Sequence, residues 1–290
     1  MPEDVDYPGA PTETDMVQQL LPEPDEMYGY RRAFMTDNEA PNRQGNAVEY
    51  PRLGENSDGE SGFEGELIEI ADEDPHPVIS IDYDGIVAGW GEYGWAYHIS
   101  FKDIKDATVN LRLITAREDN KKRMRGLDAK AGAVLEANHN TDDGAVIGDA
   151  QTPMNYNALV DAQTYLDDQT GYSGDVIVAS ASAYGEWLKN DDMTNNTEQF
   201  AGELRGGGTP DNVILDLPVV KVRRGPLQGT NSAYLVDSGA FGWESPRRPF
   251  DVVRERNNDN RRFEYLTDGR YDWVPTNPRA CLKIAGGVPQ

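Results

Sequence analysis

One long helical pattern, between residues 110 and 138, constrains this chain more than any other feature. Apolar residues recur there at helical spacing, namely at Leu113, Met124, Leu127, Ala131, Val134 and Leu135. A helix of that length spans roughly 40 Å at about 1.5 Å per residue. That is long for a globular domain built from 290 residues, so the fold has to accommodate one helix of unusual length.

The residues before this helix predict strands and a short helix. Residues 66–70 and 78–83 alternate between apolar and polar side chains, which is typical of strands. The stretch from 86 to 97 is rich in aromatic residues and glycine, and it predicts a long two-stranded excursion that needs a partner surface. Ser100, followed by Asp103, indicates a capping box for a short helix that ends at Lys105 or Asp106.

Helices and strands alternate after the long helix, which predicts an α+β fold. We expect helices at 155–168 and 182–190, the second capped by Ser182. We expect strands at 175–179, 213–215, 219–222, 233–236, 250–256, 262–266, 271–274 and 280–285. A polar, glycine-rich loop is expected between 193 and 211, and a hairpin turn at 257–260.

The first 62 residues differ from the rest of the chain. They are rich in proline, glycine, acidic residues and asparagine, and they contain no lysine. Two interpretations are open: a tail without fixed structure, or an extended arm that becomes ordered against neighbouring subunits. The aromatic residues Tyr28, Tyr30 and Phe34 favour the arm.

The charge of the chain bears on its partners and its solvent. The formal net charge is -24, which argues against an outer face that binds nucleic acid or anionic lipid. The acidic residues are dispersed along the chain and lysine is scarce, a pattern suited to a cytosol of molar salt, where the screening length is about 3 Å. An acidic protein from an ordinary cytosol is the alternative.

Nothing in the sequence predicts secretion or a membrane span. The residues from Met1 to Tyr7 lack a basic region followed by an apolar stretch, and no apolar run approaches the length of a spanning helix. Cys281 is the only cysteine, in an apolar run, so it is expected to be a small buried residue. We therefore expect a soluble protein of intracellular origin without an internal disulfide.

A search for catalytic chemistry finds no candidate. The three histidines, His76, His98 and His139, have no zinc-ligand spacing and Cys281 has no partner. The glycines at 206–208 fit neither a phosphate loop nor a dinucleotide fingerprint. The asparagine and aspartate residues at 138–144 only faintly resemble a calcium loop, because the glycine comes one position late and no glutamate closes the loop. We expect no enzyme activity, no cofactor and no metal.

One basic cluster stands out on the long helix. It consists of Arg117, Lys121, Lys122, Arg123 and Arg125. One interpretation is a helix face paired with acidic neighbours such as Glu118, Asp119 and Asp128. The other is a patch that faces packaged DNA or the acidic surface of another subunit, and the sequence does not decide between them.

The order of these elements resembles the major capsid protein fold of tailed viruses, the Hong Kong 97 fold, which encapsulins share. The residues from Trp90 to Gly94, continuing to Ile99, Ser100 and Ile104, resemble the connection between the E-loop and the spine helix. Residues 175–178 with 182–188, and 217–220 with 233–237, resemble axial-domain elements. Residues 250–274 and 278–280 resemble the final hairpin and the start of the closing axial strand.

The resemblance implies four parts. They are an extended amino-terminal arm at 1–62, an E-loop hairpin at 63–100, a peripheral domain with the spine helix at 101–145 and 246–277, and an axial domain at 146–245 and 278–290. It also implies a subunit without enzymatic activity that assembles into hexamers and pentamers around double-stranded DNA. The other partners implied are a portal and a cement or decoration protein. With the acidic composition, the expected source is a virus of a halophilic archaeon, assembled in the host cytoplasm.

Four aromatic residues are the expected contacts between subunits: Trp90, Tyr93, Trp95 and Tyr97. The alternative is that they fill the core of their own subunit. The original member of the family joins its subunits by isopeptide bonds from an E-loop lysine, but this chain has no lysine before Lys102. We therefore expect a shell held together without covalent links.

Two other functions are considered. An encapsulin-like shell in a halophile is the first alternative, although residues 1–62 weigh against it because relatives of that kind begin with a helix. A hydrolase or binding protein of a halophile is the second, and the absence of a catalytic constellation weighs against it.

Overall fold

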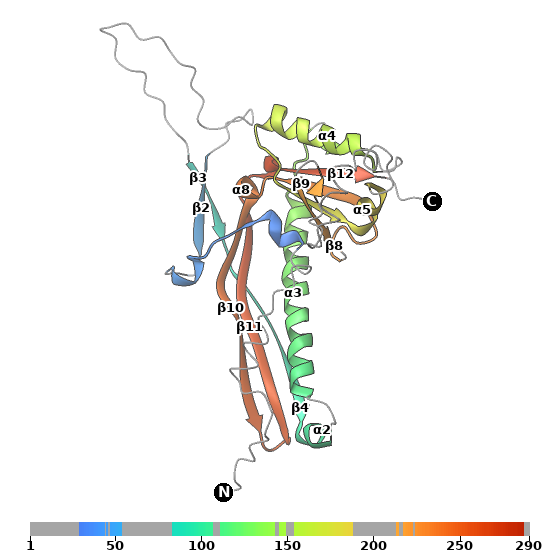
Figure 1. Ribbon diagram of the computed structural model, residues 1–290. Coiled ribbons are helices and arrows are strands. Elements are labelled where there is room, and N and C mark those ends of the chain that lie inside the picture. Colours follow the sequence, from blue (N-terminus) through green and yellow to red (C-terminus); the bar gives the residue numbers. More distant parts are fainter. Residues whose placement is uncertain are drawn as a thin grey trace, which may run out of the picture.

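The protein was analysed as a computed structural model that describes residues 29–43, 45, 47–53, 83–106, 111–142, 145–148, 154–187, 213–214, 217–222 and 224–286. The described chain has two parts (Figure 1). One is a head that contains a six-stranded sheet. The other is an elongated stalk in which one long helix runs beside long strands. The α+β class predicted from the sequence is confirmed.

The stalk helix is α3, Leu111–Ala137, with 27 residues. The helix predicted over 110–138 is therefore confirmed. A short helix, α2, Phe101–Asp106, precedes it, and the Ser100 hydroxyl accepts a hydrogen bond from the Lys102 backbone N–H at 3.1 Å. This is the helix that Ser100 and Asp103 predicted.

A four-stranded sheet packs along α3, in the order β1-β10-β11-β4. Strands β10, Gly242–Asn257, and β11, Arg262–Pro275, form a long antiparallel hairpin, and β4, Gly91–Ser100, is antiparallel to β11. The two-residue strand β1, Met35–Thr36, is parallel to β10. The turn predicted at 257–260 lies at the far end of this hairpin, and Arg261 adopts a φ of 48° there.

The head contains a six-stranded sheet in the order β5-β12-β9-β6-β8-β7. Its strands are β5, Val146–Ile147; β6, Val176–Ser180; β7, Val213–Ile214; β8, Leu217–Val222; β9, Asn231–Val236; and β12, Cys281–Gly286. Every residue of β6 and β9 is buried, as expected for central strands covered on both faces.

Helices accompany the head sheet. They are α4, Tyr156–Tyr165, continued by a π-helical turn η4, Leu166–Thr170, and α5, Ala181–Trp187. The Asn155 side chain caps α4 by accepting from the Ala158 N–H. Shorter elements are α8, Ser238–Phe241, and three 3-10 turns, η2, Tyr30–Ala33, η3, Ala40–Asn42, and η5, Pro278–Ala280.

A two-stranded ribbon projects beside the head (Figure 1). It pairs β2, Val48–Leu53, with β3, Tyr83–Ala88, in antiparallel register. The sequence placed residues 48–53 in the arm and predicted a two-stranded excursion through 86–97. Instead the pairing divides at Gly89: residues 83–88 belong to the ribbon, whereas 91–100 join the stalk sheet. Pro51 hid β2 from the sequence pattern, because proline has no N–H and usually marks a turn or an edge strand.

Two further predictions are corrected. Residues 262–266 and 271–274 are one strand, β11, because Gly269 stays in the ladder and leaves room for the Phe250 ring, whose nearest atoms would lie 3.1 Å from an added Cβ. Helix α5 is capped by Ser180, whose hydroxyl accepts from the Ala183 N–H at 3.0 Å, and not by Ser182. The predicted strand at 66–70, most of that at 78–83, and the loop at 193–211 lie outside the described residues.

Candidate assembly surfaces

The first described residues form an anchor on α3. Tyr30 is fully buried, and its hydroxyl accepts a hydrogen bond from the Leu227 N–H at 3.0 Å. Gly132 of α3 and Gly225 lie against its ring, so that a Cβ at either position would come within 2.9 Å of ring atoms. The slot that holds Tyr30 therefore requires both glycines, and it fixes where the amino-terminal segment meets α3.

Asp128 of α3 fixes the backbone of the anchor. Its carboxylate accepts hydrogen bonds from the Tyr30 N–H at 2.8 Å and from the Arg31 N–H at 3.4 Å. Burial raises the pKa of Asp128 to about 6, although the two backbone donors and Arg31 act in the opposite direction. The start of η2 is thus held by a carboxylate that is costly to keep charged.

A second buried carboxylate holds the anchor on the sheet. Arg31 Nε lies 2.8 and 2.9 Å from the two carboxylate oxygens of Glu244 on β10. The Asp37 N–H donates to the Glu244 backbone oxygen at 2.9 Å, and Phe34 packs on Phe241 with ring centroids 5.1 Å apart. Residues 30–37 are therefore bound to α3, α8 and β10 through side chains and backbone together.

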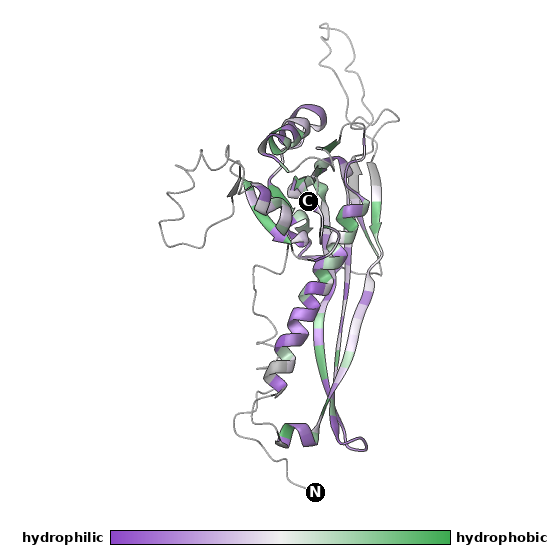
Figure 2. Cartoon of the chain, turned by 90° about the vertical axis from the view of Figure 1, so that its right-hand side faces the viewer, coloured by the Kyte–Doolittle hydropathy of each residue, from purple (hydrophilic) through white to green (hydrophobic). Residues whose placement is uncertain are grey.

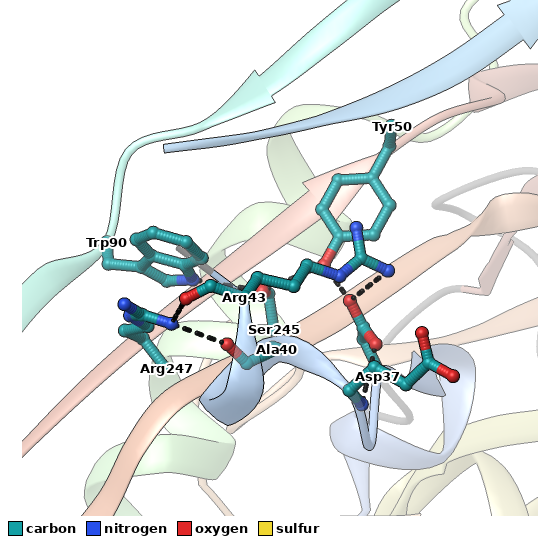
Figure 3. A network of polar contacts seen from close by, with 8 residues as sticks. Asp37, Ala40, Arg43, Tyr50, Trp90, Ser245 and Arg247 are labelled. Atoms are coloured by element: carbon teal, nitrogen blue, oxygen red, sulfur yellow. Dashed lines mark hydrogen bonds and ion pairs between the residues drawn. The ribbon is translucent and has the colours of Figure 1, made fainter. Parts of the chain in front are cut away.

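The base of the ribbon is joined to the stalk sheet by a polar network (Figure 3). The hydroxyl of Ser245, a fully buried residue of β10, accepts from Trp90 Nε1 at 2.9 Å and lies 2.8 Å from the Tyr50 hydroxyl. The same Tyr50 hydroxyl lies 2.7 Å from an Asp37 carboxylate oxygen. Burial raises the pKa of Tyr50 to about 12, so its hydroxyl stays protonated and donates.

Two arginines complete this network (Figure 3). Arg43 pairs with the Asp37 carboxylate at 3.1 Å, and its guanidinium lies 5.7 Å from the centroid of the Tyr50 ring. Arg247 donates to the backbone oxygens of Ala40 and Arg43, and its guanidinium lies 5.1 Å from the Trp90 ring centroid. The ribbon, the turn η3 and strand β10 therefore share one set of contacts, which sets the direction of the ribbon.

Two of the four aromatics proposed as subunit contacts pack between β4, β10, β11 and α3. Trp95 donates from Nε1 to an Asp119 carboxylate oxygen at 2.5 Å, and its ring centroid lies 5.5 Å from that of Phe250. Tyr97 stacks on Tyr265 at 4.8 Å with an interplanar angle of 10°. Both side chains are half-buried and contact their own subunit.

The other two aromatics also contact their own subunit. Tyr93 packs against the buried apolar cluster that contains Trp273, and the centroids of the two rings are 6.4 Å apart. The Lys130 ammonium lies 5.5 Å from the centroid of the Tyr93 ring. Trp90 lies in the ribbon-base network. The structure thus shows contacts of these four side chains within their own subunit. The prediction that they also touch a neighbouring subunit stays a prediction.

The outer face of the stalk sheet carries an exposed apolar row. The register places Ala96 beside Leu266, and Leu266 beside Val253, on β4, β11 and β10. Leu266 and Val253 are 41% and 46% exposed. Ion pairs flank the row, such as Arg262 with Glu264 at 2.7 Å and Arg270 with Glu92 at 3.3 Å.

The predicted basic cluster is divided by the geometry of α3. Arg123 is buried, lies 3.6 Å from Asp119 and faces Phe250, so it belongs to the interior between α3 and the sheet. Burial raises the pKa of Asp119, against the hydrogen bond from Trp95 and the charge of Arg123. Arg123 is thus paired with an acidic neighbour of its own helix.

The remaining members of the cluster lie at the surface. Arg117, Lys122 and Arg125 are exposed, and Lys121 is half-exposed and pairs with Glu118 at 2.6 Å. The Lys122 ammonium lies 4.8 Å from the Trp95 ring centroid. The lower half of α3 in Figure 2, which contains these residues, is accordingly coloured mostly hydrophilic.

The described part of the chain has neither a metal-ligand cluster nor a candidate membrane span. No group of three or more His, Cys, Asp or Glu side chains converges there as metal ligands would. No described helix combines the length and the apolar character of a membrane span. Cys281 is buried and free, and burial raises the pKa of its thiol.

Comparison with known families decides the assignment. The family described as phage capsid protein matches residues 92–284, which run from β4 through α3 and the head sheet to β12. This chain belongs to the phage capsid protein family. The matched region contains α3, both long strands of the hairpin and most of the head sheet.

Solved structures from phages and from a GTA particle share the fold at low sequence identity. A Mycobacterium phage Che8 structure matches with a TM-score of 0.64 and 14% identity, over 88% of this chain and 90% of that one. The capsid of a native GTA particle matches with a TM-score of 0.66 and 12% identity, over 92% of both chains. The mature capsid of bacteriophage PhiM1 matches with a TM-score of 0.56 and 13% identity, over 90% and 87%.

This capsid protein therefore has the Hong Kong 97-like fold expected from the order of its elements. No curated protein matches it in sequence.

The polar contacts that hold the ribbon base and the anchor of this capsid protein were missed in the sequence. The ribbon base depends on Ser245 and Asp37, and the anchor depends on Asp128 and Glu244, all polar residues of common type. Their partners lie up to 213 residues away in the chain, so the spacing of nearby residues in the sequence cannot predict these contacts. Tyr30 and Phe34 gave a signal, as aromatic residues in an otherwise polar segment, and Trp90 and Asp128 were noticed but given other roles, as a subunit contact and as a neighbour of the basic cluster.

Proposed function

We propose that this protein is the major capsid protein of a tailed virus that infects a halophilic archaeon. Its subunits would assemble into hexamers and pentamers of an icosahedral head that encloses double-stranded DNA. Assembly would take place in the host cytoplasm, with a portal and a cement or decoration protein as further partners. The observation that carries this proposal is the family match over residues 92–284, which includes the whole stalk helix and sheet from Glu92 onward.

The parts of the fold support distinct roles in such a shell. The sequence predicted the E-loop over residues 63–100, but residues 91–100 belong to the stalk sheet. We therefore assign the ribbon of β2 and β3, with residues 54–82 between its strands, as the E-loop. Residues 101–145 and 246–277 would form the peripheral domain, and 146–245 with 278–290 the axial domain. A two-stranded ribbon is marginally stable alone, so a neighbouring subunit is the expected surface for it.

The contacts between subunits are proposed to be noncovalent. The reassigned E-loop, residues 48–88, contains no lysine, so it has no amine for an isopeptide bond. Side chains available at the surface include the exposed row of Val253 and Leu266 and the partly exposed faces of Trp90, Tyr93, Trp95 and Tyr97. Apolar contacts of this kind strengthen in the presence of salts that are excluded from protein surfaces.

The charge of the protein supports the halophilic source. A net charge of -24 on 290 residues produces strong repulsion between subunits in dilute buffer. At 1 M salt the screening length falls to about 3 Å, and that repulsion is largely removed. Assembly of this subunit is therefore expected to require salt.

Particle size is the test of this function. Purified protein is held in molar KCl, and its particles are measured by electron microscopy and light scattering before and after dialysis to low salt. Closed shells that dissociate on dialysis, and that contain nuclease-protected duplex DNA when isolated from infected cells, are the expected result. A monomer at every salt concentration contradicts the shell, and shells that hold a protein cargo in place of DNA contradict the viral function.

A further inference from the structure

The exposed cations of α3 form a stripe that continues into the anchor. Arg117, Lys121 and Arg125 follow one another at four-residue spacing, so they share one side of the helix. The same row reaches Asp128 and Gly132, which hold the backbone and the ring of Tyr30. The amino-terminal segment therefore joins α3 on the side of the helix that carries the cations.

Few acidic side chains of α3 neutralise the positive charge of this stripe. Lys122 lies beside the three stripe residues and is exposed, as Arg117 and Arg125 are, whereas Lys121 is half-exposed. The exposed acid among residues 117–125 is Glu118, which pairs with Lys121. Asp119 is turned inward to Trp95 and Arg123. In the described part of the chain, no ion pair includes Arg117 or Arg125, and the charge of Arg125 acts on the same Glu118 carboxylate that pairs with Lys121. One exposed acid thus faces several cations, so a negatively charged partner from outside these residues fits the stripe.

The segment that precedes the anchor has the complementary charge. Residues 1–28 contain eight acidic side chains and no lysine, arginine or histidine. Three of the acids, Glu23, Asp25 and Glu26, stand within six residues of Gly29. The chain thus enters the anchor directly after its own acidic segment.

The lengths agree with a docked arrangement. Along α3, Arg125, Lys121 and Arg117 lie about 4.5, 10 and 16 Å from Asp128 at 1.5 Å per residue. An extended chain covers at most about 3.5 Å per residue, so three to six residues before Gly29 reach up to about 10 to 20 Å. Glu26, Asp25 and Glu23 can therefore reach the three stripe residues without a gap.

We propose that residues 1–28 dock through their carboxylates on the α3 stripe of the same subunit, formed by Arg117, Lys121 and Arg125, and on Lys122 beside it. The anchor holds the segment beside the stripe, which gives it an effective concentration that a free ligand lacks. Duplex DNA is the competing occupant, but the net charge of -24 opposes its approach to the protein as a whole. The proposal concerns the single subunit and does not depend on shell formation.

Zero-length cross-linking tests the proposal on the full chain. A carbodiimide joins lysine amines to carboxylates in contact, and mass spectrometry identifies the linked residues. Two contacts serve as internal references, Lys121 with Glu118 and Lys283 with Glu136, each at 2.6 Å. The expected result is links from Lys121 or Lys122 to Glu23, Asp25 or Glu26, with a yield comparable to that of the references.

A matched pair of variants makes the result specific. Arg117→Gln with Arg125→Gln is expected to lower the yield of these links roughly fivefold, because two exposed ion pairs are lost. Arg248→Gln with Arg270→Gln removes the same charge from exposed positions on the stalk sheet and is expected to leave the yield unchanged. An equal loss in both pairs would mean that only net charge matters, and it would overturn the proposal.

Three other outcomes also overturn it. The reference links form, but Lys121 and Lys122 join only to Glu118. The links to residues 1–28 connect isotopically light chains to heavy ones, which would assign the stripe to a neighbouring subunit. The links appear in particles only after nuclease removes the DNA, which would make DNA the occupant. Each outcome can be read from subunits or particles, so failure here leaves the shell function separately testable.

Discussion

Arg31 and Glu244 stand 213 residues apart in the sequence, and the Arg31 guanidinium donates hydrogen bonds to both carboxylate oxygens of Glu244, at 2.8 and 2.9 Å from Nε. The Glu244 side chain is 2% exposed and that of Arg31 is 19% exposed. A carboxylate so deeply buried is stable in its charged form only while its partner is present. The pair thus makes the position of the amino-terminal segment a condition for the stability of strand β10.

Removal of this partner is expected to be costly. Arg31→Gln leaves the Glu244 carboxylate buried without a positive charge, and we expect a loss of about 3 kcal/mol in the free energy of unfolding. Urea unfolding of the subunit, monitored by tryptophan fluorescence, measures the loss. Arg224→Gln, at an exposed position, is the control and is expected to stay within about 0.5 kcal/mol of the parent. Equal effects in the two variants would contradict the role of the buried pair.

Asp128 is expected to make stability depend on pH. Its pKa rises from 3.8 in the unfolded chain to about 6 in the folded protein, so the folded state binds the proton more tightly. The stabilisation from this proton is complete below pH 3.8 and is lost as the pH rises through 6. A difference of about two pKa units corresponds to at most about 3 kcal/mol.

Asp128→Asn isolates that contribution. The amide oxygen can still accept from the Tyr30 and Arg31 N–H groups, but it cannot lose a proton. We expect the stability of the variant relative to the parent to increase between pH 4 and pH 7, measured by urea unfolding at each pH. A parallel pH dependence in variant and parent would rule out Asp128 as the titrating group.

The tyrosine slot makes a prediction about two glycines of one helix. At Gly132 an added methyl group would come within 2.9 Å of the buried Tyr30 ring, whereas at Gly126 no atom lies within 4 Å. Gly132→Ala is therefore expected to destabilise the protein by about 1 to 3 kcal/mol through overpacking. Gly126→Ala is expected to stabilise it by about 0.5 to 1 kcal/mol, because alanine favours helix. Thermal unfolding of the two variants checks both signs.

The sequence predicted best those elements whose periodicity is uninterrupted. The apolar spacing of Leu127, Ala131 and Leu135 predicted α3, and all three are buried. The prediction failed at residues whose type usually marks a turn but which here lie within a strand. Proline and glycine usually mark turns, so Pro51 concealed β2 and Gly269 made β11 look like two strands. In the structure Pro51 lies within the ribbon, and Gly269 keeps its place in the ladder beside Phe250.

The contacts that position the ribbon and the anchor were beyond sequence reasoning for a different reason. The hydroxyl of Ser245 and the carboxylate of Asp128 have ordinary neighbours in the sequence, and their importance comes from burial beside distant partners. The basic cluster shows the same limit. Spacing alone placed Arg123 with Arg117 and Arg125, but the packing of α3 on the sheet turns Arg123 inward.

The corrected cap of α5 can be checked directly. Ser180 accepts a hydrogen bond from the Ala183 N–H, whereas Ser182 is exposed. Ser180→Ala is expected to cost about 1 kcal/mol of stability, as the loss of a helix cap usually does. Ser182→Ala is expected to be neutral, and the comparison uses the same substitution two residues apart. Urea unfolding of both variants decides which serine caps the helix.

Ser245 gives the prediction that connects stability with assembly. Ser245→Ala removes the acceptor for Trp90 Nε1 and the partner of the Tyr50 hydroxyl within a buried network. We expect a loss of about 1 to 3 kcal/mol, the cost of leaving buried donors unpaired. The loss should be local, since Trp90 and Tyr50 belong to the ribbon base, so hydrogen exchange should accelerate in 48–53 and 83–90.

If the ribbon binds a neighbouring subunit, its direction matters for assembly. Shells of Ser245→Ala are then expected to form at lower yield, or to require more salt, than shells of the parent. Thr276→Ala is a suitable comparison, because Thr276 is buried and donates to the backbone oxygens of Ala240 and Phe241, away from the ribbon. Equal losses of shell yield in both variants would trace the defect to overall stability, whereas a loss confined to Ser245→Ala would trace it to the orientation of the ribbon.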